Sequence, residues 1–167
     1  MLLTPTIALR PATPDDAEAV ATIWHAGWPD GHLGHVPAAL VEHRQRADFD
    51  RRVPGRLPTT TVAVSGSQVV GFVTVVDDEI EQLYVAEPAR GSDAAATLLQ
   101  HGEELIARHA GTAWLAVVAG NARARRFYER QGWSNAGPFD NMADIDSGTI
   151  AVPCLRYEKS FEREGIA

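Results

Sequence analysis

Residues 79–99 place a strand, a tight turn and a helix one after another without a gap. Residues 79–85 carry a polar alternate face, which is typical of a half-buried β-strand. The turn after them contains Pro88 and Gly91, and an amphipathic helical pattern begins directly afterwards. The first N–H groups of such a helix have no partner within the helix, and the positive end of its dipole lies there. The segment therefore predicts a site for phosphate or pyrophosphate, and hence a phosphate-bearing cofactor.

Hydrophobic periodicity organises the whole chain into alternating strands and helices. Strands are predicted over residues 7–10, 60–64, 69–76, 79–85, 113–119, 135–139 and 150–157. Four helices are predicted: from a cap at Thr13 to a break at 27–31, from Pro37 to Pro54, from the turn to Gly111, and from Asn121 to Gly132. No repeat or low-complexity linker interrupts this order. Residues 1–167 are therefore expected to form a single domain of the α/β (α+β) class.

The composition excludes several classes of protein. A chain of 167 residues with 45% hydrophobic content can bury the core of one globular domain. The net charge of −7 argues against nucleic-acid binding and favours an amine-bearing substrate. Cys154 is the only cysteine, so no internal disulfide or cysteine metal cluster can form. No stretch approaches the roughly 20 apolar residues of a membrane span, which argues against membrane insertion. Residues 1–5 are too short and polar for a signal peptide, so we expect a cytoplasmic protein.

Four stretches of sequence form a set that is seldom met by chance in this strand order. They are residues 9–16, 70–73, 83–91 and 118–133. In the most specific one, Asn121 precedes a helix that carries Phe127-Tyr128-Glu129 and then Gly132-Trp133. Through them the chain resembles the GCN5-related N-acetyltransferase (GNAT) superfamily over nearly its full length. The resemblance implies a mixed, mostly antiparallel sheet of six to seven strands with four helices, splayed between strands four and five.

The resemblance also implies that acetyl-CoA binds in that splayed cleft. Backbone groups of the fourth strand would pair with the pantetheine arm, and the following turn would hold the pyrophosphate. The implied cofactor contacts are Leu83, Tyr84, Val85, Arg90, Gly91, Ser92, Asp93, Ala94, Ala95, Asn121, Arg125 and Tyr128. A strand-four N–H, of Leu83 or Val85, would hold the thioester carbonyl oxygen.

Asp93 departs from the superfamily pattern, which has glycine at this place in the turn. One interpretation is that Asp93 caps the helix, with its carboxylate turned back to the N–H of Ala95 or Ala96. The other is that its charge repels the phosphates and weakens or abolishes cofactor binding; two like charges at ~4 Å repel by about 1 kcal/mol in water and about 4 at an effective dielectric near 20. Arg90 and Arg125 are expected to offset part of that repulsion.

Acetyl transfer to an amine needs a base for the ammonium and a proton for the departing thiolate. Tyr128 is the candidate acid, because a phenol with a pKa near 10 is protonated at neutral pH. Glu79 and Glu81 are alternative bases, and simple alternation puts both on the strand face that carries Leu83 and Val85. Glu79 matches the superfamily's glutamate most closely, whereas Glu81 lies one pleat nearer the thioester.

Trp24, His25, Trp28 and the loop through His43 are expected to form one wall of the acceptor pocket, since the resemblance implies that the first two helices and their connection shape substrate choice; Trp24 also fits the core. No metal site is expected, because His32 and His35 have a chelating spacing but no acidic or cysteine partner nearby. The leading hypothesis is an acetyl-CoA-dependent N-acetyltransferase (an acyltransferase, with CoA as product) acting on a small-molecule amine or a peptide. The alternative is a catalytically weak acyl-CoA-binding or regulatory module. Late strands often pair two copies in this superfamily, which makes a homodimer a possible assembly.

Overall fold

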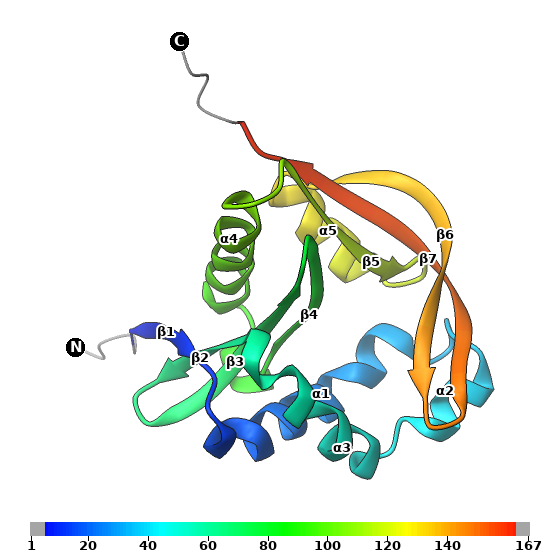
Figure 1. Ribbon diagram of the computed structural model, residues 1–167, viewed down its shortest axis with the longest axis horizontal. Coiled ribbons are helices and arrows are strands. Elements are labelled where there is room, and N and C mark those ends of the chain that lie inside the picture. The colour runs from blue at the N-terminus through cyan, green and yellow to red at the C-terminus, as the bar shows by residue number, and fades with distance from the viewer. Residues whose placement is uncertain (1–5, 163–167) are drawn as a thin grey trace.

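The computed structural model describes residues 6–162; residues 1–5, on which the signal-peptide prediction rests, and 163–167 lie outside that range. Within it, one sheet contains seven strands in the order β1-β2-β3-β4-β5-β7-β6 (Figure 1). The strands are β1 (Ile7–Pro11), β2 (Thr60–Ser65), β3 (Gln68–Val76), β4 (Glu79–Val85), β5 (Thr112–Val118), β6 (Ser134–Ile145) and β7 (Gly148–Ser160). Only β4 and β5 run parallel; the other neighbours are antiparallel, which confirms the predicted mixed sheet.

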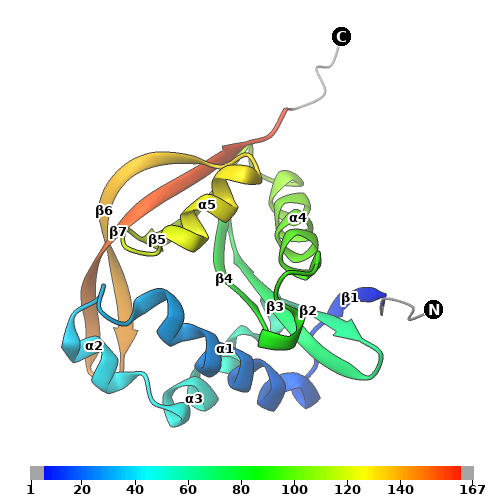
Figure 2. The same cartoon turned by 180° about the vertical axis from the view of Figure 1, so that it is seen from behind.

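Helices cover both faces of this sheet (Figures 1 and 2). In residues 6–162 they are α1 (Ala17–His32), α2 (Ala38–His43), α3 (Arg46–Arg56), α4 (Ala94–Ala107) and α5 (Ala122–Arg130). Helices α1 and α3 bury Trp24 and Phe49 against Phe72 of β3. Helix α4 buries Leu98 against Val73 on the opposite face, and α5 packs beside that second core. None of the helices in this range is long and apolar enough to cross a membrane.

Strands β4 and β5 separate almost as soon as they begin. They pair only at Glu79 and Trp114, where the indole N–H of Trp114 also donates to the Asp78 carboxylate at 3.1 Å. Beyond that point the two strands diverge, and α5 follows the end of β5 (Figure 2). The predicted splay between the fourth and fifth strands is therefore confirmed.

The prediction that the first helix breaks at residues 27–31 is wrong, because α1 continues to His32. Its two glycines allow close packing instead of ending the helix. A Cβ at Gly27 would lie 2.7 Å from the Tyr84 ring, and one at Gly31 would lie 2.8 Å from the amide nitrogen of Asn121. Pro29 is tolerated inside the helix, where its carbonyl still accepts from the Leu33 N–H at 3.0 Å. These close contacts bring α1 against both β4 and the loop after β5.

The segment predicted as one helix from Pro37 to Pro54 is two helices, so the described chain has five helices rather than four. The chain leaves the helical conformation at Arg44 and Gln45. Arg44 is buried at this corner, where its guanidinium bonds the Asp48 carboxylate at 2.9 Å and the Asp144 carbonyl at 2.7 Å. The strongly charged stretch of residues 42–52 is thus partly buried.

Two further boundaries differ from the sequence prediction. Helix α4 ends at Ala107, four residues before Gly111, because the Ile106 carbonyl accepts from both His109 and Ala110. Strands β6 and β7 are longer than predicted, although each contains a proline, which is unfavourable inside a strand. Pro138 is tolerated because β6 lies at the sheet edge, and Pro153 because it lies beyond the end of the β5 pairing.

Candidate active site

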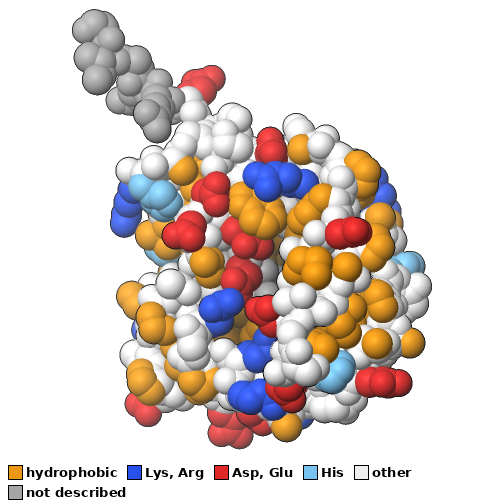
Figure 3. Space-filling view, turned by 45° about the vertical axis from the view of Figure 1, so that its right-hand side comes forward, with side chains coloured by type: hydrophobic (Ala, Val, Ile, Leu, Met, Phe, Trp, Pro, Cys, Tyr) orange, Lys and Arg blue, Asp and Glu red, His pale blue; other side chains and the backbone are white. Residues whose placement is uncertain are grey.

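The divergence of β4 and β5 opens one large cleft of about 930 Å³. Its walls come from β4, β5, α1, α3, α5 and the β6–β7 hairpin, and its rim includes the turn before α4. A space-filling view shows a hollow on one face of the molecule in which acidic and basic side chains lie side by side (Figure 3). Most of the residues predicted from the sequence meet in this one cleft, although they come from five separate segments.

The turn before α4 has the geometry of an anion receptor. Gly91 has φ +79°, a backbone conformation that side-chain-bearing residues rarely adopt, so the sharp turn requires glycine there. The first bond of α4 runs from the Thr97 N–H to the Asp93 carbonyl at 2.9 Å. Within residues 6–162 no acceptor bonds the N–H of Ala95 or Ala96. These two donors therefore remain available at the positive end of the helix.

Asp93 occupies the N-cap position, but the expected capping bond is absent. Its carboxylate bonds no N–H of the described chain and is exposed at the cleft rim. The Ser92 hydroxyl takes over that role, accepting from the Ala94 N–H at 3.3 Å. Asp93 has φ −78°, so its backbone does not require glycine. The interpretation that the carboxylate turns back onto Ala95 or Ala96 is wrong, and the charge stays at the anion site.

Two predicted cofactor residues do not line the cleft. Ala94 is fully buried under the turn. Arg125 points away and donates to the Tyr157 hydroxyl at 3.2 Å and the Ala119 carbonyl at 3.0 Å, so it does not offset Asp93. Arg123, two residues earlier in the chain, lines the cleft instead. The only feature of the sequence that could have marked Arg123 as a cleft residue is its place in the first turn of α5. Arg90 does line the cleft, and its guanidinium is paired with Asp30 of α1 at 3.0 Å.

Strand β4 contains a β-bulge at Glu81. Thr74 of β3 pairs with Gln82, and the next β3 residue, Val75, pairs with Ile80. One extra residue therefore sits on β4 and shifts the alternation of side chains beyond it. Sequence alternation alone cannot reveal such an insertion.

Because of the bulge, the expectation that Glu79 and Glu81 share a face with Leu83 and Val85 is wrong. Leu83 and Val85 pack with the core under α4. Glu81 points to the opposite side and accepts from Arg56 of α3 at 2.6 Å. Tyr84 also lies on that side, against Gly27 of α1. The bulge thus turns the polar side chains of β4 into the half of the cleft that α1 and α3 enclose.

Glu79 and Glu81 differ sharply in their surroundings. Burial, followed by the negative charges of Glu81 and Asp78, raises the pKa of Glu79 to about 7. Glu79 makes no ion pair with any residue in 6–162, whereas Glu81 is held by Arg56. Glu79 is therefore the carboxyl that can gain and lose a proton near neutral pH.

Tyr128 and Asn121 both lie on the cleft wall formed by α5 and its start. Burial raises the pKa of Tyr128 above its ordinary value, so its hydroxyl stays protonated. No residue of the described chain bonds that hydroxyl, although its ring packs near Trp133 and Tyr157. The Asn121 side chain accepts from the Ala124 N–H at 3.2 Å, which confirms it as the helix cap.

Trp24 and Trp28 both line the cleft, which also has a wall that sequence reasoning missed. Trp24 is 2% exposed and meets Phe49 edge-on at a centroid distance of 5.0 Å, so it belongs mainly to the core. Trp28 stacks on His32 at 4.5 Å. The missed wall is the β6–β7 hairpin, which contributes Asn141, Met142, Ala143, Asp144, Val152 and Cys154. Nothing in the local sequence of that hairpin signals its approach to α2.

His32 and His35 are used in packing. The Nδ1 atom of His32 lies 2.7 Å from the Trp28 carbonyl, and His35 lies against Gly120. Within residues 6–162 no three His, Cys, Asp or Glu side chains are grouped so as to hold a metal ion.

The comparisons with known proteins agree with this geometry. A sequence model of the Acetyltransferase (GNAT) family matches residues 17–133. A GCN5-related N-acetyltransferase of Rhodopseudomonas palustris is 26% identical, with a TM-score of 0.73 over 96% of this chain and 99% of that one. No curated protein matches the chain in sequence.

Two further solved structures share the fold. YncA of Salmonella typhimurium, solved with its cofactor acetyl-CoA, is 15% identical with a TM-score of 0.69 over 97% of this chain and 98% of that one. PaiA N-acetyltransferase of Thermoplasma acidophilum, solved with coenzyme A, is 16% identical with a TM-score of 0.65 over 93% and 99%.

Replacing the exposed carboxylate of the turn tests its electrostatic effect. Asp93→Asn should bind coenzyme A two- to fivefold more tightly at low salt, because repulsion between like charges at ~4 Å in water is worth about 1 kcal/mol. The gain should shrink at about 0.5 M salt, where the charges are screened. Titration calorimetry measures both, with Glu87→Gln, an equal charge change outside the cleft, as control. Equal affinities of Asp93→Asn and the wild type at low salt would show that the Asp93 carboxylate does not repel the cofactor.

Proposed function

Because this chain belongs to the acetyltransferase (GNAT) family, we propose that it is an acetyl-CoA-dependent N-acetyltransferase. The acceptor is a primary amine of a small molecule or peptide, which attacks the thioester directly. The observation that carries this proposal is the cleft at the divergence of β4 and β5, which ends at the free N–H groups of Ala95 and Ala96.

The residues around this cleft fit coenzyme A. A diphosphate would accept from the N–H groups of Ala95 and Ala96, on a turn that Gly91 makes sharp enough. The edge of β4 that faces β5 has no strand partner beyond Glu79 in the described chain, so Leu83, Tyr84 and Val85 can offer backbone groups to an extended pantetheine arm. Asn121 lies across from them on the β5 side.

Acetyl-CoA, when bound, supplies an acetyl thioester whose carbonyl carbon a neutral amine can attack. Glu79 takes the proton from the ammonium form of the acceptor, directly or through water, and so supplies the neutral amine. A base works best when its pKa lies near the working pH, and the pKa of about 7 meets that condition. The ion pair of Glu81 with Arg56 supports Glu79 rather than Glu81 as the base. The N–H of Leu83 or Val85 is suited to hold the carbonyl oxygen.

Tyr128 completes the reaction as the acid. The new C–N bond forms as the C–S bond breaks, and the departing sulfur needs a proton. The Tyr128 hydroxyl lines the cleft, is protonated, and has no competing acceptor in the described chain. When Tyr128 donates its proton to the thiolate, it becomes a phenolate. Solvent, or Glu79 with the proton it took from the amine, then protonates the phenolate again.

Removing the Tyr128 hydroxyl tests this role. Tyr128→Phe should lower kcat about tenfold to hundredfold, because a positioned acid contributes at least that much. The affinity for coenzyme A should stay within about twofold, since the ring is retained. The assay follows thiol release from acetyl-CoA in the presence of an amine panel. Unchanged kcat would remove Tyr128 from the mechanism, and thermal stabilisation by acetyl-CoA without any thiol release would favour the binding-module alternative.

Replacing Glu79 tests the base through its pH dependence. In the wild type, kcat/KM should rise with pH through an inflection near 7, and Glu79→Gln should lose both the inflection and most of the rate. Folding raises the pKa of Glu79 from its ordinary 4.5 to about 7. Between pH 4.5 and about pH 7 the unfolded chain therefore loses this proton more readily than the folded one, and the free energy of unfolding falls as the pH rises. Glu79→Gln should therefore melt at a higher temperature than wild type at about pH 8 but not at about pH 4.

The matched control is Glu104→Gln, which changes an exposed carboxyl of α4 outside the cleft. It should keep the wild-type pH profile of kcat/KM. A Glu79→Gln variant that retains the inflection near pH 7 would exclude Glu79 as the base.

A further inference from the structure

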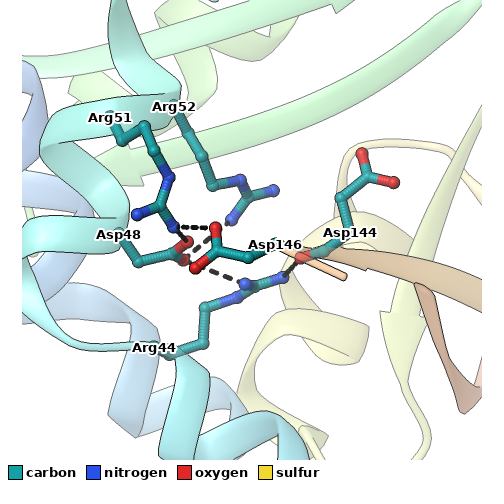
Figure 4. A network of polar contacts seen from close by, with 6 residues as sticks. All are labelled: Arg44, Asp48, Arg51, Arg52, Asp144 and Asp146. Atoms are coloured by element: carbon teal, nitrogen blue, oxygen red, sulfur yellow. Dashed lines mark hydrogen bonds and ion pairs between the residues drawn. The ribbon is translucent and has the colours of Figure 1, made fainter. Parts of the chain in front are cut away.

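A buried carboxylate in α3 is surrounded by more positive charge than it can neutralise. Asp48 is 5% exposed and lies within ion-pair distance of three guanidinium groups (Figure 4). Arg51 approaches it to 2.7 Å and Arg44 to 2.9 Å, but Arg52 only to 3.7 Å, which is beyond hydrogen-bond range. One carboxylate thus makes good bonds to two arginines and leaves the third without one.

The first two arginines find their remaining partners on the β6–β7 hairpin. Arg44 donates to the Asp144 carbonyl, and Arg51 pairs with the Asp146 carboxylate (Figure 4). A fourth arginine of the same region, Arg56, is paired with Glu81. Arg52 alone of this group makes no hydrogen bond to any residue in 6–162.

Arg52 is nevertheless held in place and faces the cleft. Its guanidinium carbon lies 4.7 Å from the centre of the Trp24 ring, a cation–π arrangement that fixes the plane of the group. Its side chain is 23% exposed, and the residue lines the cleft. Burial, followed by the positive charge of Arg44, lowers the pKa of Arg52, so its positive charge is poorly compensated. A fixed planar fork of free N–H donors is suited to bind a carboxylate through two parallel hydrogen bonds.

Arg52 and the proposed base belong to the same half of the cleft. The negative charge of Glu81 raises the pKa of Glu79 and also acts on Arg52, so both groups lie near Glu81. Both are on the side of β4 that α1 and α3 enclose. The acceptor half therefore has carboxylates for an ammonium and one free guanidinium for an anion.

We propose that Arg52 binds a carboxylate of the acceptor, so that the acceptor is an amino acid or a related amino-carboxylic acid. This inference rests on the proposed function and names the substrate class for that site. An amine with a carboxylate complements Glu79 and Arg52 together. A polyamine has no group for Arg52, and it places further positive charge beside a guanidinium that already lacks a full partner. A peptide N-terminus presents a neutral amide in place of the carboxylate.

A thiol-release assay with matched acceptors tests the inference. The probes are the twenty common amino acids, each beside its α-carboxamide, together with 4-aminobutyrate, spermidine and the peptide dialanine amide, which has no carboxylate. At least one carboxylate-bearing amine should be acetylated with kcat/KM about tenfold or more above that of its amide, because a charge-assisted bond is lost in the amide. Arg52→Gln should raise KM for that acid about tenfold or more and leave kcat/KM for the amide within about twofold.

The control is Arg51→Gln, which removes another arginine next to Asp48 from a residue that does not line the cleft. It should keep the preference for the acid. Arg52→Lys should retain only part of it, because lysine keeps the charge but loses the planar fork. Thermal shift by acetyl-CoA shows whether each variant is folded and competent for the cofactor.

Each outcome decides between the two proposals. Acetylation of amides, spermidine or the peptide as fast as the acids overturns the carboxylate inference but supports the acetyltransferase. Stabilisation by acetyl-CoA with no turnover of any acid in the panel also overturns the inference. An acid preference that survives Arg52→Gln excludes Arg52 as its source. No binding of acetyl-CoA by the wild type refutes the proposed function itself. The wild-type comparison of acid with amide keeps the inference testable even where Arg52→Gln does not fold.

Discussion

The separation of β4 from β5 is the constraint on which the rest of the site depends. Adjacent parallel strands normally satisfy one another's backbone groups, but these two pair at a single position. Beyond it, α1 packs against both sides of the opening, through Gly27 on Tyr84 and Gly31 on Asn121. The core under α4 holds β4 from one face and the core around Trp24 holds it from the other. The unpaired strand edge is thus held rigidly open, as a template for an extended ligand arm.

The two halves of the cleft have different electrostatics, and the bulge at Glu81 separates them. Toward the end of β4 the available groups are backbone N–H donors and a helix dipole, disturbed by the exposed carboxylate of Asp93. In the first half of β4 the bulge turns carboxylates toward α3, where Arg56 pairs with Glu81, and Glu79 makes no ion pair in the described chain. Burial then keeps the Glu79 proton in exchange near neutral pH. In the same half, the shortage of carboxylate around Asp48 leaves Arg52 with free donors. These two groups match the proposed acceptor, an amine that also carries a carboxylate.

Much of the fold could be predicted from the sequence, because strong periodicity and turn residues mark β2 to β5, α4 and α5. The strand, turn and helix predicted within residues 79–99 are present, and Asn121 caps α5 as predicted. The failures have specific causes. Gly27 and Gly31 resemble helix breakers, but their lack of a side chain serves tertiary contacts that no local pattern reveals. The bulge at Glu81 adds one residue to β4 and so reverses the face of the side chains before it. Arg44 and Arg52 belong to a charged stretch without a local sign of burial, and the β6–β7 hairpin, 100 residues away in the sequence, helps to bury the first.

A crystal structure of the protein with coenzyme A tests the central claim most directly. The pantetheine arm should lie along the β4 edge at Leu83–Val85, between β4 and β5, with the diphosphate on the N–H groups of Ala95 and Ala96. Electron density for the ligand outside the divergence of these strands, or an Asp93 side chain that fills the turn while the cleft stays without ligand at saturating coenzyme A, would contradict it.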